Sequence, residues 1–331
     1  VVQEAKQMGY LFKAGPECEF FLFDLAQDGS VTTETKEKGG FFDVGPVDAG
    51  ENARREMVLT LEEMNFEVEA SYHANAPAQH EIDFKYDGGL ATADNLMTFR
   101  MAVRTIARRH GLQATFMPKP KSGVDGSGMH LNLSLHNADG ANIFSDSSAE
   151  HGLSREGVHF IAGLLEHIDA VTAITNPLVN SYKRLVPGYG APVYVAWSAA
   201  ANRSALLRTG LKNGMVNRIE LRSPDPSANP YLALAVCLAA GLDGIQRRLL
   251  PPERVDGNIY EMTEAERREH GIRSLPENLA CALDALEADE LLRGVLGERL
   301  FGSYLAAKRA EWKEYRTTVS EWEVGQYLNR F

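Results

Sequence analysis

Apolar side chains recur along the chain with two different spacings, which predict a mixture of helices and strands. Residues 57–64 and 96–106 have apolar side chains every three to four positions, as amphipathic helices do, and the stretch between them, 66–86, is extended in pattern. Further segments follow one pattern or the other: helices at 1–8, 154–174 and 231–242, and strands at 17–23, 129–135 and 216–222. Because helix-like and strand-like segments do not alternate regularly, the pattern predicts an α+β fold rather than a doubly wound parallel sheet.

Two other segments follow neither pattern. Residues 28–40 form a loop rich in glycine, threonine and lysine, and residues 176–214, rich in glycine, proline and tyrosine, are predicted to be a long connection. A connection of that length inside a compact protein usually has a function. From residue 276 onward the pattern is helical. We expect either one large domain over residues 1–331, with a helical C-terminal region at 276–331, or two closely packed domains.

The composition is that of a globular protein with a large core, and it argues against two classes of partner. Of 331 residues, 44% are hydrophobic and 24% charged, and 45 acidic residues against 34 basic ones give a net charge of -11. Since no basic run interleaved with aromatics is present, we expect no binding to nucleic acid or to anionic membranes. The longest apolar stretch, 231–242, is shorter than the roughly 18 residues of a membrane-spanning helix. Three scattered cysteines and no secretory signal predict a cytoplasmic protein without disulfides.

Three of the predicted strands each place polar side chains on one face, because alternate residues of a strand point to opposite sides. In the first of them, Glu17 and Glu19 share one face while Cys18 and Phe20 share the other. The other two strands show the same division, with polar faces made of His130, Asn132 and Ser134, and of Arg218, Glu220 and Arg222. A single polar face is most often simply solvated, but three such faces together favour a shared site.

The residue types on these faces suit phosphoryl transfer assisted by a metal. Carboxylates with one imidazole are the expected ligands of Mg²⁺ or Mn²⁺, whereas zinc favours more histidine or cysteine. Arginines beside such a site bind carboxylate and phosphate groups through paired hydrogen bonds. The chain has no P-loop, GxGxxG or GxSxG motif, which argues against the nucleotide-binding folds and hydrolases that use them. A glycine-rich loop at 123–128 is as consistent with a plain turn as with a ligand cradle.

Nine short motifs, taken in order, resemble the motif series of bacterial type I glutamine synthetases. They are GPECEF at 15–20, QHE at 79–81, KP at 119–120, GSGMH at 126–130, NP at 176–177, NSYKRL at 180–185, NRS at 202–204, RIELR at 218–222 and NPYLA at 229–233. The resemblance extends from about residue 15 to the C-terminus, and so many motifs in the right order make it highly specific. It implies a glutamine-synthetase-type catalytic domain, with a mostly antiparallel sheet and flanking helices, and it implies that this family's small N-terminal β-grasp domain is missing here.

The resemblance also implies a reaction and a set of site residues. In this family ATP phosphorylates the side-chain carboxylate of glutamate, and an amine then displaces phosphate from the acyl phosphate. The implied metal ligands, for Mg²⁺ or Mn²⁺, are Glu19 and Glu81 near glutamate, and Glu17, His130 and Glu220 near the ATP phosphates. The implied substrate and ATP contacts are Arg184 and Arg222 on glutamate, with Gly126 and Arg203 beside it, and Arg203, Arg208, Arg218, His130, Asn132 and Ser134 on ATP. Of these, Arg184, Arg203 and Arg222 would take part in catalysis by stabilising the transferred charge.

The resemblance further implies an assembly. Type I enzymes are homo-oligomers of two stacked hexameric rings, so we expect a dodecamer. Their active sites lie between subunits and are completed by the N-terminal domain.

Five positions depart from the family pattern, and the departures gather where the family binds ammonium. The family has a carboxylate at Ala74, which serves metal and ammonium, and a glutamate on a mobile flap at Gly190. Phe41 stands in place of a tyrosine, Tyr72 in place of a histidine and Asp125 in place of an asparagine. Because losing one general base typically costs about 10² to 10⁴ in rate, we expect ammonium to be a poor substrate.

Two interpretations of these departures compete. In the first, the pocket accepts a larger, less cationic amine and the enzyme makes γ-glutamyl amides of alkyl, aryl or polyamines. In the second, the chain is a decayed paralogue with a binding or regulatory role. The retained carboxylates and arginines of the ATP side favour the first. Whether Asn75 or His73 replaces the ligand missing at position 74 is left open by the sequence.

Overall fold

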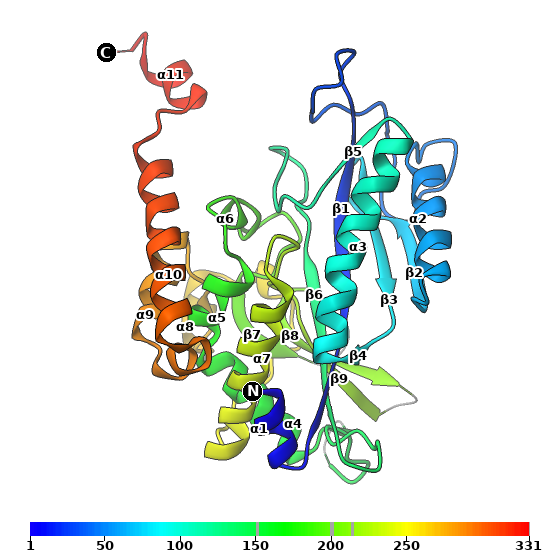
Figure 1. Ribbon diagram of the computed structural model, residues 1–331. Helices are drawn as coiled ribbons and strands as arrows, with labels where there is room; N and C mark the ends of the chain where they lie inside the picture. The colour runs from blue at the N-terminus through cyan, green and yellow to red at the C-terminus, as the bar shows by residue number, and fades with distance from the viewer. Residues whose placement is uncertain (150–151, 199–201, 213–214, 331) are drawn as a thin grey trace.

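The computed structural model describes residues 1–149, 152–198, 202–212 and 215–330, and within them a ten-stranded sheet forms the centre of the molecule (Figure 1). The strands are β1 (Leu11–Asp24), β2 (Val68–His73), β3 (Gln79–Phe84), β4 (Asp87–Gly88), β5 (Leu112–Thr115), β6 (Met129–His136), β7 (Tyr194–Ser198), β8 (Ala205–Lys212), β9 (Met215–Leu221) and β10 (Arg273–Ser274). They are ordered β10-β7-β8-β9-β6-β1-β3-β2, and β4 and β5 also pair with β1. Among these pairs only β7 and β8 run parallel. The predicted α+β fold with a mostly antiparallel sheet is therefore confirmed.

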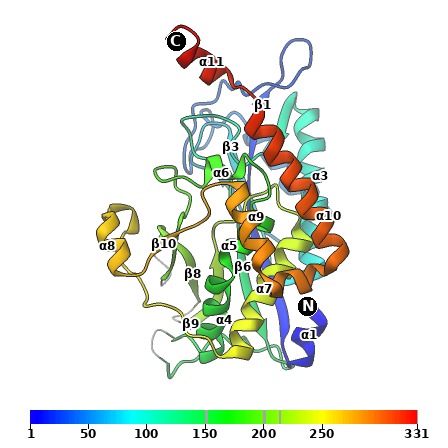
Figure 2. The ribbon, with the colours of Figure 1, turned by 90° about the vertical axis from the view of Figure 1, so that its left-hand side faces the viewer.

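Helices cover the sheet and extend beyond it. They are α1 (Val2–Gln7), α2 (Glu51–Glu63), α3 (Gly89–Arg109), α4 (Arg155–Glu166), α5 (Ile168–Thr175), α6 (Ser181–Arg184), α7 (Pro230–Arg247), α8 (Glu264–Glu269), α9 (Leu279–Ala288), α10 (Glu290–Thr317) and α11 (Glu321–Tyr327). Figure 2 shows α3, α7 and α10 together on one side of the sheet. The end of α10 leads to α11, which projects from the body, so the two chain ends lie far apart.

Alternation along β1 explains how this strand separates the core from the site. Cys18 and Phe20 are fully buried, and Phe20 packs edge-on against Phe99 of α3 with 6.1 Å between ring centroids. Glu17 and Glu19 lie on the opposite face. One long strand therefore contributes apolar side chains to the core and carboxylates to the other side of the sheet.

The NPYLA motif at 229–233 forms the start of α7, and its first two residues favour the beginning of a helix. Asn229 is the N-cap, and its side chain accepts hydrogen bonds from the backbone N–H groups of Tyr231 and Leu232 at 3.0 and 3.2 Å. Pro230 occupies the first helical turn, where its missing N–H has no cost. In the helix that follows, 11 of the 18 residues are buried.

Two predictions about secondary structure were wrong. Residues 154–174 form two helices, α4 and α5, which meet at a 73° bend. His167 stands at this corner and its ring nitrogens contact Asp289 at 2.7 Å and Asp243 at 3.1 Å, so polar contacts fix a turn that apolar spacing does not reveal. The supposed connection at 176–214 contains α6, β7 and β8. β7 is buried along nearly its whole length, so it lacks the polar alternation by which a strand is recognised.

Across the part of the chain that the structure describes, no single helix is long and apolar enough to cross a membrane. The pair α4 and α5 meets the length and composition criteria only when taken together across the bend.

Candidate functional site

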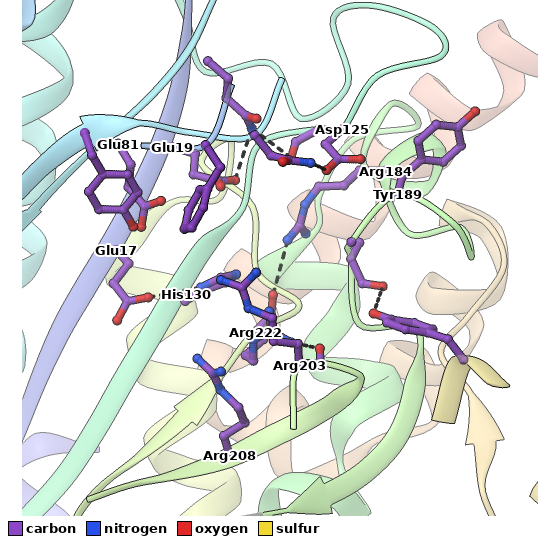
Figure 3. A pocket seen from close by; sticks show the side chains of 18 residues that line it. Glu17, Glu19, Glu81, Asp125, His130, Arg184, Tyr189, Arg203, Arg208 and Arg222 are labelled. Carbon is purple, nitrogen blue, oxygen red and sulfur yellow. Dashed lines mark hydrogen bonds and ion pairs between the residues drawn. The ribbon is translucent and has the colours of Figure 1, made fainter. Parts of the chain in front are cut away.

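A cavity of about 340 Å³ opens on the polar face of the central strands (Figure 3). Most of its carboxylates and its imidazole come from the strands, as does Tyr72 on β2, whereas Arg184 comes from α6, and Arg203, Phe41, Asp125 and Gly190 come from loops. The lining residues are Glu17, Glu19, Phe41, Tyr72, Asn75, Gln79, Glu81, Asp125, Gly126, His130, Arg184, Tyr189, Gly190, Ala191, Arg203, Arg208, Arg222 and Tyr260. The polar faces of three separate strands thus meet in one place.

Carboxylates on β1 and β3 face one another across the strand pair. Glu19 lies directly opposite Glu81, and Glu17 lies directly opposite Asp83. Burial, and then the charge of Glu19, raises the pKa of Glu81 well above its ordinary value. Burial and the charge of Glu17 raise the pKa of Asp83 to about 8. Like charges directly opposite each other are unfavourable, so this group of side chains has a negative charge that a cation would relieve.

On the other side of β1, Glu17 contacts β6. His130 Nδ1 lies 3.2 Å from a Glu17 carboxylate oxygen, and the Asn132 side-chain amide donates to the other oxygen at 2.9 Å. Although burial opposes it, these hydrogen bonds lower the pKa of Glu17 to about 2. Glu17 is therefore a carboxylate held in its charged form.

Glu220 on β9 is the centre of charge on the same side. Arg208 donates to both of its oxygens, each at 2.8 Å, in a paired arrangement. The Nε atom of Arg222 lies 3.3 Å away and His130 Nδ1 lies 3.5 Å away. Because Glu220 is only 2% exposed, these contacts hold both arginines at the cavity wall.

Two sets of donors fit a divalent metal ion. The ligand atoms of Glu17, His130 and Glu220 all lie within 4.8 Å of one another. A carboxylate has about four lone-pair sites, so Glu220 can hold Arg208 and still offer an oxygen. Glu19 and Glu81 form the second set, whose mutual repulsion a cation would remove. Oxygen ligands with a single imidazole are the chemistry of Mg²⁺ or Mn²⁺.

Arg184 is buried and is oriented by the backbone around it. Its guanidinium donates to the Ser223 carbonyl at 2.6 Å and to the Arg222 carbonyl at 3.3 Å. The glycine-rich loop lies against it: a Cβ atom on Gly128 would lie 2.5 Å from Arg184 Nη2, and one on Gly126 would lie 2.3 Å from the Pro118 carbonyl oxygen and 3.1 Å from Arg184 Cγ. Glycine at 128 is therefore needed for close packing on Arg184, and glycine at 126 chiefly for close packing on the Pro118 backbone.

Three of the expected ATP contacts lie beside the cavity and do not line it. Arg218 Nε donates to the Asn132 side-chain oxygen at 2.8 Å, which continues the row that begins at Glu17. Ser134 is buried and its hydroxyl lies 3.1 Å from His136 Nε2. Asn132 and Arg218 therefore support the lining residues, while Ser134 is engaged further along β6.

The opposite wall of the cavity is mainly aromatic. Phe41 and Phe42 lie with 4.2 Å between ring centroids, and Tyr72 lies 6.0 Å and 4.8 Å from them. The Tyr72 hydroxyl is hydrogen-bonded to Glu81, and burial and the charge of Glu81 raise its pKa. The guanidinium carbon of Arg203 lies 5.4 Å from the centre of the Phe41 ring.

Asp125 is the carboxylate of this wall. The side-chain amide of Asn75 donates a hydrogen bond to it. A Cβ atom placed on Gly190 would lie 3.5 Å from Asp125 Oδ2, so the space that a larger side chain at 190 would enter adjoins this carboxylate. Gly190 has φ +68°, a conformation that favours glycine.

The strand register settles what can stand near position 74. Tyr72 pairs with Glu81 and faces the cavity, whereas His73 pairs with His80 and faces the other side of β2 and β3. His73 therefore cannot replace a ligand at Ala74, which is itself buried. Asn75 lines the cavity but is bonded to Asp125.

Several cavity residues were not singled out from the sequence. They are Asp83, a carboxyl group with a raised pKa near Glu81 that does not itself line the cavity, and the lining residues Tyr189, Ala191 and Tyr260. The Tyr260 hydroxyl donates to the Ala191 carbonyl at 2.9 Å, which ties the loop at residues 185–193 to a distant part of the chain. Lys119 Nζ lies 3.5 Å from the centre of the Tyr189 ring. The sequence distinguished Tyr189 only by its place in the Gly- and Pro-rich stretch at 176–214. Nothing in the sequence indicated that Tyr260 would line the cavity.

Comparisons with known proteins agree with this geometry. A family model described as "Glutamine synthetase, catalytic domain" matches residues 1–327. Proteins named glutamine synthetase from Clostridium saccharobutylicum and Thermus thermophilus are 56% and 55% identical over 99% of this chain, which spans 74% and 73% of their length. A glutamine synthetase from Halobacterium salinarum is 52% identical over 100% of this chain and 73% of its own.

Solved structures with a similar fold include two of a protein called GmaS. "GmaS/ADP complex-Conformation 1" has a TM-score of 0.88, and "Apo GmaS without ligand" has a TM-score of 0.87. Each is 36% identical and covers 99% of this chain and 75% of the other. The family generally uses a divalent metal with ATP, and its members act on glutamate and an amine and are typically oligomeric. By its sequence, its fold and the residues gathered in its cavity, this chain belongs to the glutamine synthetase family of ligases.

Proposed function

We propose that this protein joins glutamate to an amine larger than ammonia, using ATP and a γ-glutamyl phosphate intermediate. One observation carries the proposal: the cavity combines a charged wall suited to ATP, metal and glutamate with an aromatic wall that holds the carboxylate of Asp125. The first wall supports the family's phosphoryl chemistry. The aromatic wall offers apolar surface to an organic substituent, which a small cation such as ammonium lacks.

The charged wall has a role for each of its groups. Mg²⁺ or Mn²⁺, when bound by Glu17, His130 and Glu220 and by Glu19 and Glu81, would neutralise phosphate charge and orient the glutamate carboxylate. Arg184, fixed by backbone carbonyls, holds the α-carboxylate of glutamate.

Arginines stabilise the phosphoryl group as it transfers. Arg208 and Arg222 are held by Glu220 in fixed positions, and Arg203 stands at the rim, where it is exposed and can move toward the γ-phosphate. Groups positioned in advance where charge develops stabilise the transition state without reorganising. Asn132 donates a hydrogen bond to Glu17, and Arg218 in turn donates to Asn132, so both residues keep the Glu17 carboxylate in place.

The aromatic wall binds the acceptor. The organic group of an amine packs against Phe41 and Tyr72, while its ammonium group lies at Asp125 and gives up a proton to this carboxylate. The neutral nitrogen then attacks the γ-carbonyl carbon of the acyl phosphate, inorganic phosphate leaves, and the second nitrogen proton passes to solvent. Gly190 leaves room for a substituent on the nitrogen. The resulting product class is a γ-glutamyl amide.

The comparisons support the two halves of this proposal unequally. The relatives described above are named glutamine synthetase, which supports ammonium as an acceptor that must be tested beside other amines. One of the two GmaS structures is a complex with ADP, which supports nucleotide binding on this scaffold. A decayed paralogue would have no reason to keep Arg208 in paired hydrogen bonds with Glu220 and Arg222 beside them, which weighs against the alternative of a purely regulatory role.

We also propose that the chain acts as one catalytic domain within a dodecamer of two hexameric rings in the cytoplasm. Support for assembly comes from α10 and α11, which project from the body with several large apolar side chains exposed. These are Tyr315, Val319, Trp322, Val324, Tyr327 and Leu328. Burying them against other subunits would remove an exposed apolar surface.

A phosphate-release assay on the full-length protein tests the function. With glutamate, ATP and Mg²⁺ or Mn²⁺, we expect release to depend on an added amine and to be faster with alkyl, arylalkyl or diamines than with ammonium. If only ammonium stimulated release, the protein would be an ordinary glutamine synthetase. If no amine did, and ATP binding did not depend on metal, the paralogue interpretation would replace the proposal.

A further inference from the structure

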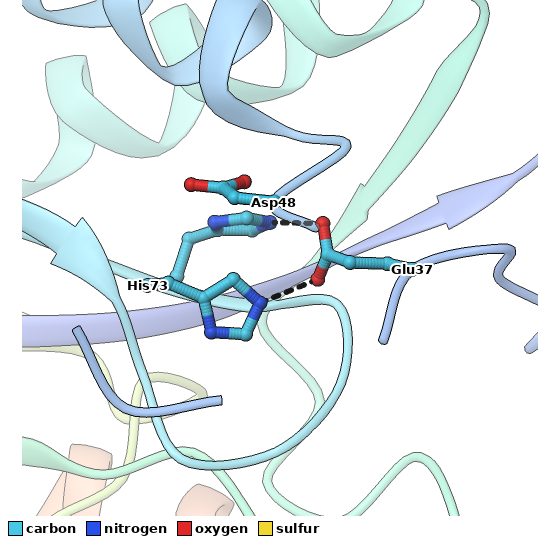
Figure 4. Close-up of side chains that lie close together, drawn as sticks. Glu37, Asp48 and His73 are labelled. Carbon is cyan, nitrogen blue, oxygen red and sulfur yellow. Dashed lines mark hydrogen bonds and ion pairs between the residues drawn. The ribbon is translucent and has the colours of Figure 1, made fainter. Parts of the chain in front are cut away.

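A second cluster of buried titratable side chains lies outside the cavity, on the other side of β2 and β3 (Figure 4). It consists of Glu37, Asp48, His73 and His80, joined by Arg54. The side chains of both histidines and of Asp48 are fully buried, and that of Glu37 is 3% exposed. Nothing in the proposed reaction uses these groups.

The composition of the cluster suits a metal ion, but Arg54 decides against one. Arg54 Nη1 lies 2.7 Å from His80 Nδ1, and because a guanidinium only donates, this nitrogen must accept. The ring proton of His80 is then on Nε2, the nitrogen that faces Glu37 at 3.7 Å. Arg54 Nη2 also lies 2.7 Å from Asp48. Arg54 therefore supplies the positive charge that a metal ion would otherwise bring.

His73 is held from both of its ring nitrogens. Its Nδ1 atom lies 2.7 Å from the Ala74 carbonyl and its Nε2 atom 2.6 Å from a Glu37 oxygen, and because both partners only accept, both nitrogens donate when the ring is protonated. Although burial opposes it, these hydrogen bonds raise the pKa of His73. The same Glu37 carboxylate accepts the backbone N–H of Ala78 at 2.5 Å and that of Gly50 at 3.0 Å. One buried carboxylate, in the middle of residues 25–50, thus joins the turn between β2 and β3 to Gly50 at the C-terminal end of that loop.

That loop, residues 25–50 between β1 and α2, winds closely around His73. At Gly39 the backbone touches the imidazole, since a Cβ atom there would lie 2.7 Å from His73 Nε2. At Phe42 the backbone N–H donates to the His73 carbonyl at 3.0 Å, and φ is +62°, a strained conformation for a residue with a side chain. Along the chain, Phe41 lies between the two positions that make these contacts, Gly39 and Phe42.

We propose that Glu37 is a positioning residue for the acceptor: its contacts with His73, Gly50 and Ala78 hold the loop so that the Phe41 ring stands at the cavity wall. The ring lies beside Tyr72 and under Arg203 only while the loop follows this path. The inference rests on the proposed function in one respect, that the acceptor meets Phe41. It does not depend on which amine is the acceptor.

The test compares Glu37→Gln with the full-length wild-type protein. Glutamine keeps the size but turns an acceptor of three hydrogen bonds into a group that can no longer accept all of them. We expect the KM for the acceptor that the wild type uses best, ammonium included, to rise about tenfold, because displacements near 1 Å are costly in a preorganised site. We expect the KM for ATP to change by less than about twofold. Glu37→Asp, which keeps the charge, should restore part of the acceptor KM.

A measurement independent of activity accompanies the kinetics. Hydrogen exchange of the peptide that includes Phe42 should be at least about tenfold faster in Glu37→Gln, since its amide depends on the path around His73. The matched control is Glu34→Gln, which removes the same charge from an exposed position in the same loop and should change neither quantity. Normal acceptor KM and normal exchange in Glu37→Gln would overturn the proposal, as would an equal rise in the KM of every substrate. If the wild type used no amine, the proposed function would fail, and the exchange result alone would still decide whether Glu37 holds the loop.

Discussion

The two walls of the cavity are built from different kinds of structure. On the charged wall, Glu17, Glu19, His130 and Glu220 lie on adjacent strands, and the register of β1 with β3 and β6 sets their spacing. On the aromatic wall, Tyr72 comes from β2, but Phe41, Asp125 and Gly190 come from loops. Strand register leaves little freedom to change the first wall without disrupting the sheet, whereas loops tolerate replacement.

The comparison also bears on the five departures from the family pattern that we expect from the sequence. Four of these positions, Phe41, Tyr72, Asp125 and Gly190, line the cavity on its aromatic side, and Ala74 is buried directly after β2. A loop needs its own anchors to position a side chain accurately, and the contacts of Glu37 with His73 and two backbone amides supply them. Under the proposed function, phosphoryl transfer thus depends on the sheet, and the choice of acceptor depends mainly on the loops.

The largest effect should come from breaking the charged wall at its centre. Glu220→Gln removes the charge that holds Arg208 and Arg222, and displaced arginines no longer stabilise the transferred phosphoryl group. We expect kcat for phosphate release to fall by about 10²- to 10³-fold, as for other losses of preorganised charge. Glu63→Gln, an exposed change on α2, is the control and should be neutral. A fall of less than about fivefold in Glu220→Gln would show that Glu220 is not the centre of this wall.

A smaller and more selective effect should follow from changing the aromatic wall. Asp125→Asn keeps the contact with Asn75 possible but removes the carboxylate, and hydrogen bonds to a charged group are worth about 1.5–3 kcal/mol. We expect the KM for the acceptor to rise about tenfold and the KM for ATP to stay within about twofold, both measured by steady-state kinetics. Asp139→Asn, in an exposed turn, serves as control. A rise in the KM for ATP equal to that for the acceptor would mean that the two walls are not separate.

The two walls should also differ in how stability depends on pH. Asp83, behind the charged wall, has a pKa raised to about 8, so the folded protein binds a proton more tightly there than the unfolded chain does. Its contribution to stability is present below the unfolded pKa and is lost as pH rises toward about 8. The melting temperature of the metal-free protein should therefore fall more between pH 6 and pH 8 in the wild type than in Asp83→Asn. Equal falls in the two proteins would contradict this assignment.

The smallest effect should come from adding a hydroxyl to the aromatic wall. Phe41→Tyr keeps the ring but adds a polar group to a pocket that otherwise favours organic substituents. We expect kcat/KM for ammonium to rise about two- to threefold relative to the best larger amine, a difference of the size of a weak net hydrogen bond. Phe42→Tyr, whose ring is more exposed, is the matched control. A fall in the ratio would show that Phe41 does not face the acceptor.

The sequence predicted the charged wall better than the aromatic wall, for a physical reason. Alternation within a strand places Glu17 and Glu19 on one face without any knowledge of the fold. Which loop residues meet in space depends on turns and packing, so the approach of Asp125 to Gly190 and the reach of Tyr260 to Ala191 could not be predicted. The side of the sheet to which the His73 side chain points could not be predicted either, because it follows from the register of β2 with β3.

The product of a competition between acceptors tests the central claim most directly. The full-length protein is incubated with glutamate, ATP, Mg²⁺ and equal concentrations of ammonium, a short alkylamine, an arylalkylamine and a diamine, and the products are identified by mass spectrometry. If the charged wall performs the family's chemistry and the aromatic wall selects the acceptor, a γ-glutamyl amide of one of the larger amines will exceed glutamine. Glutamine as the sole product would contradict the account.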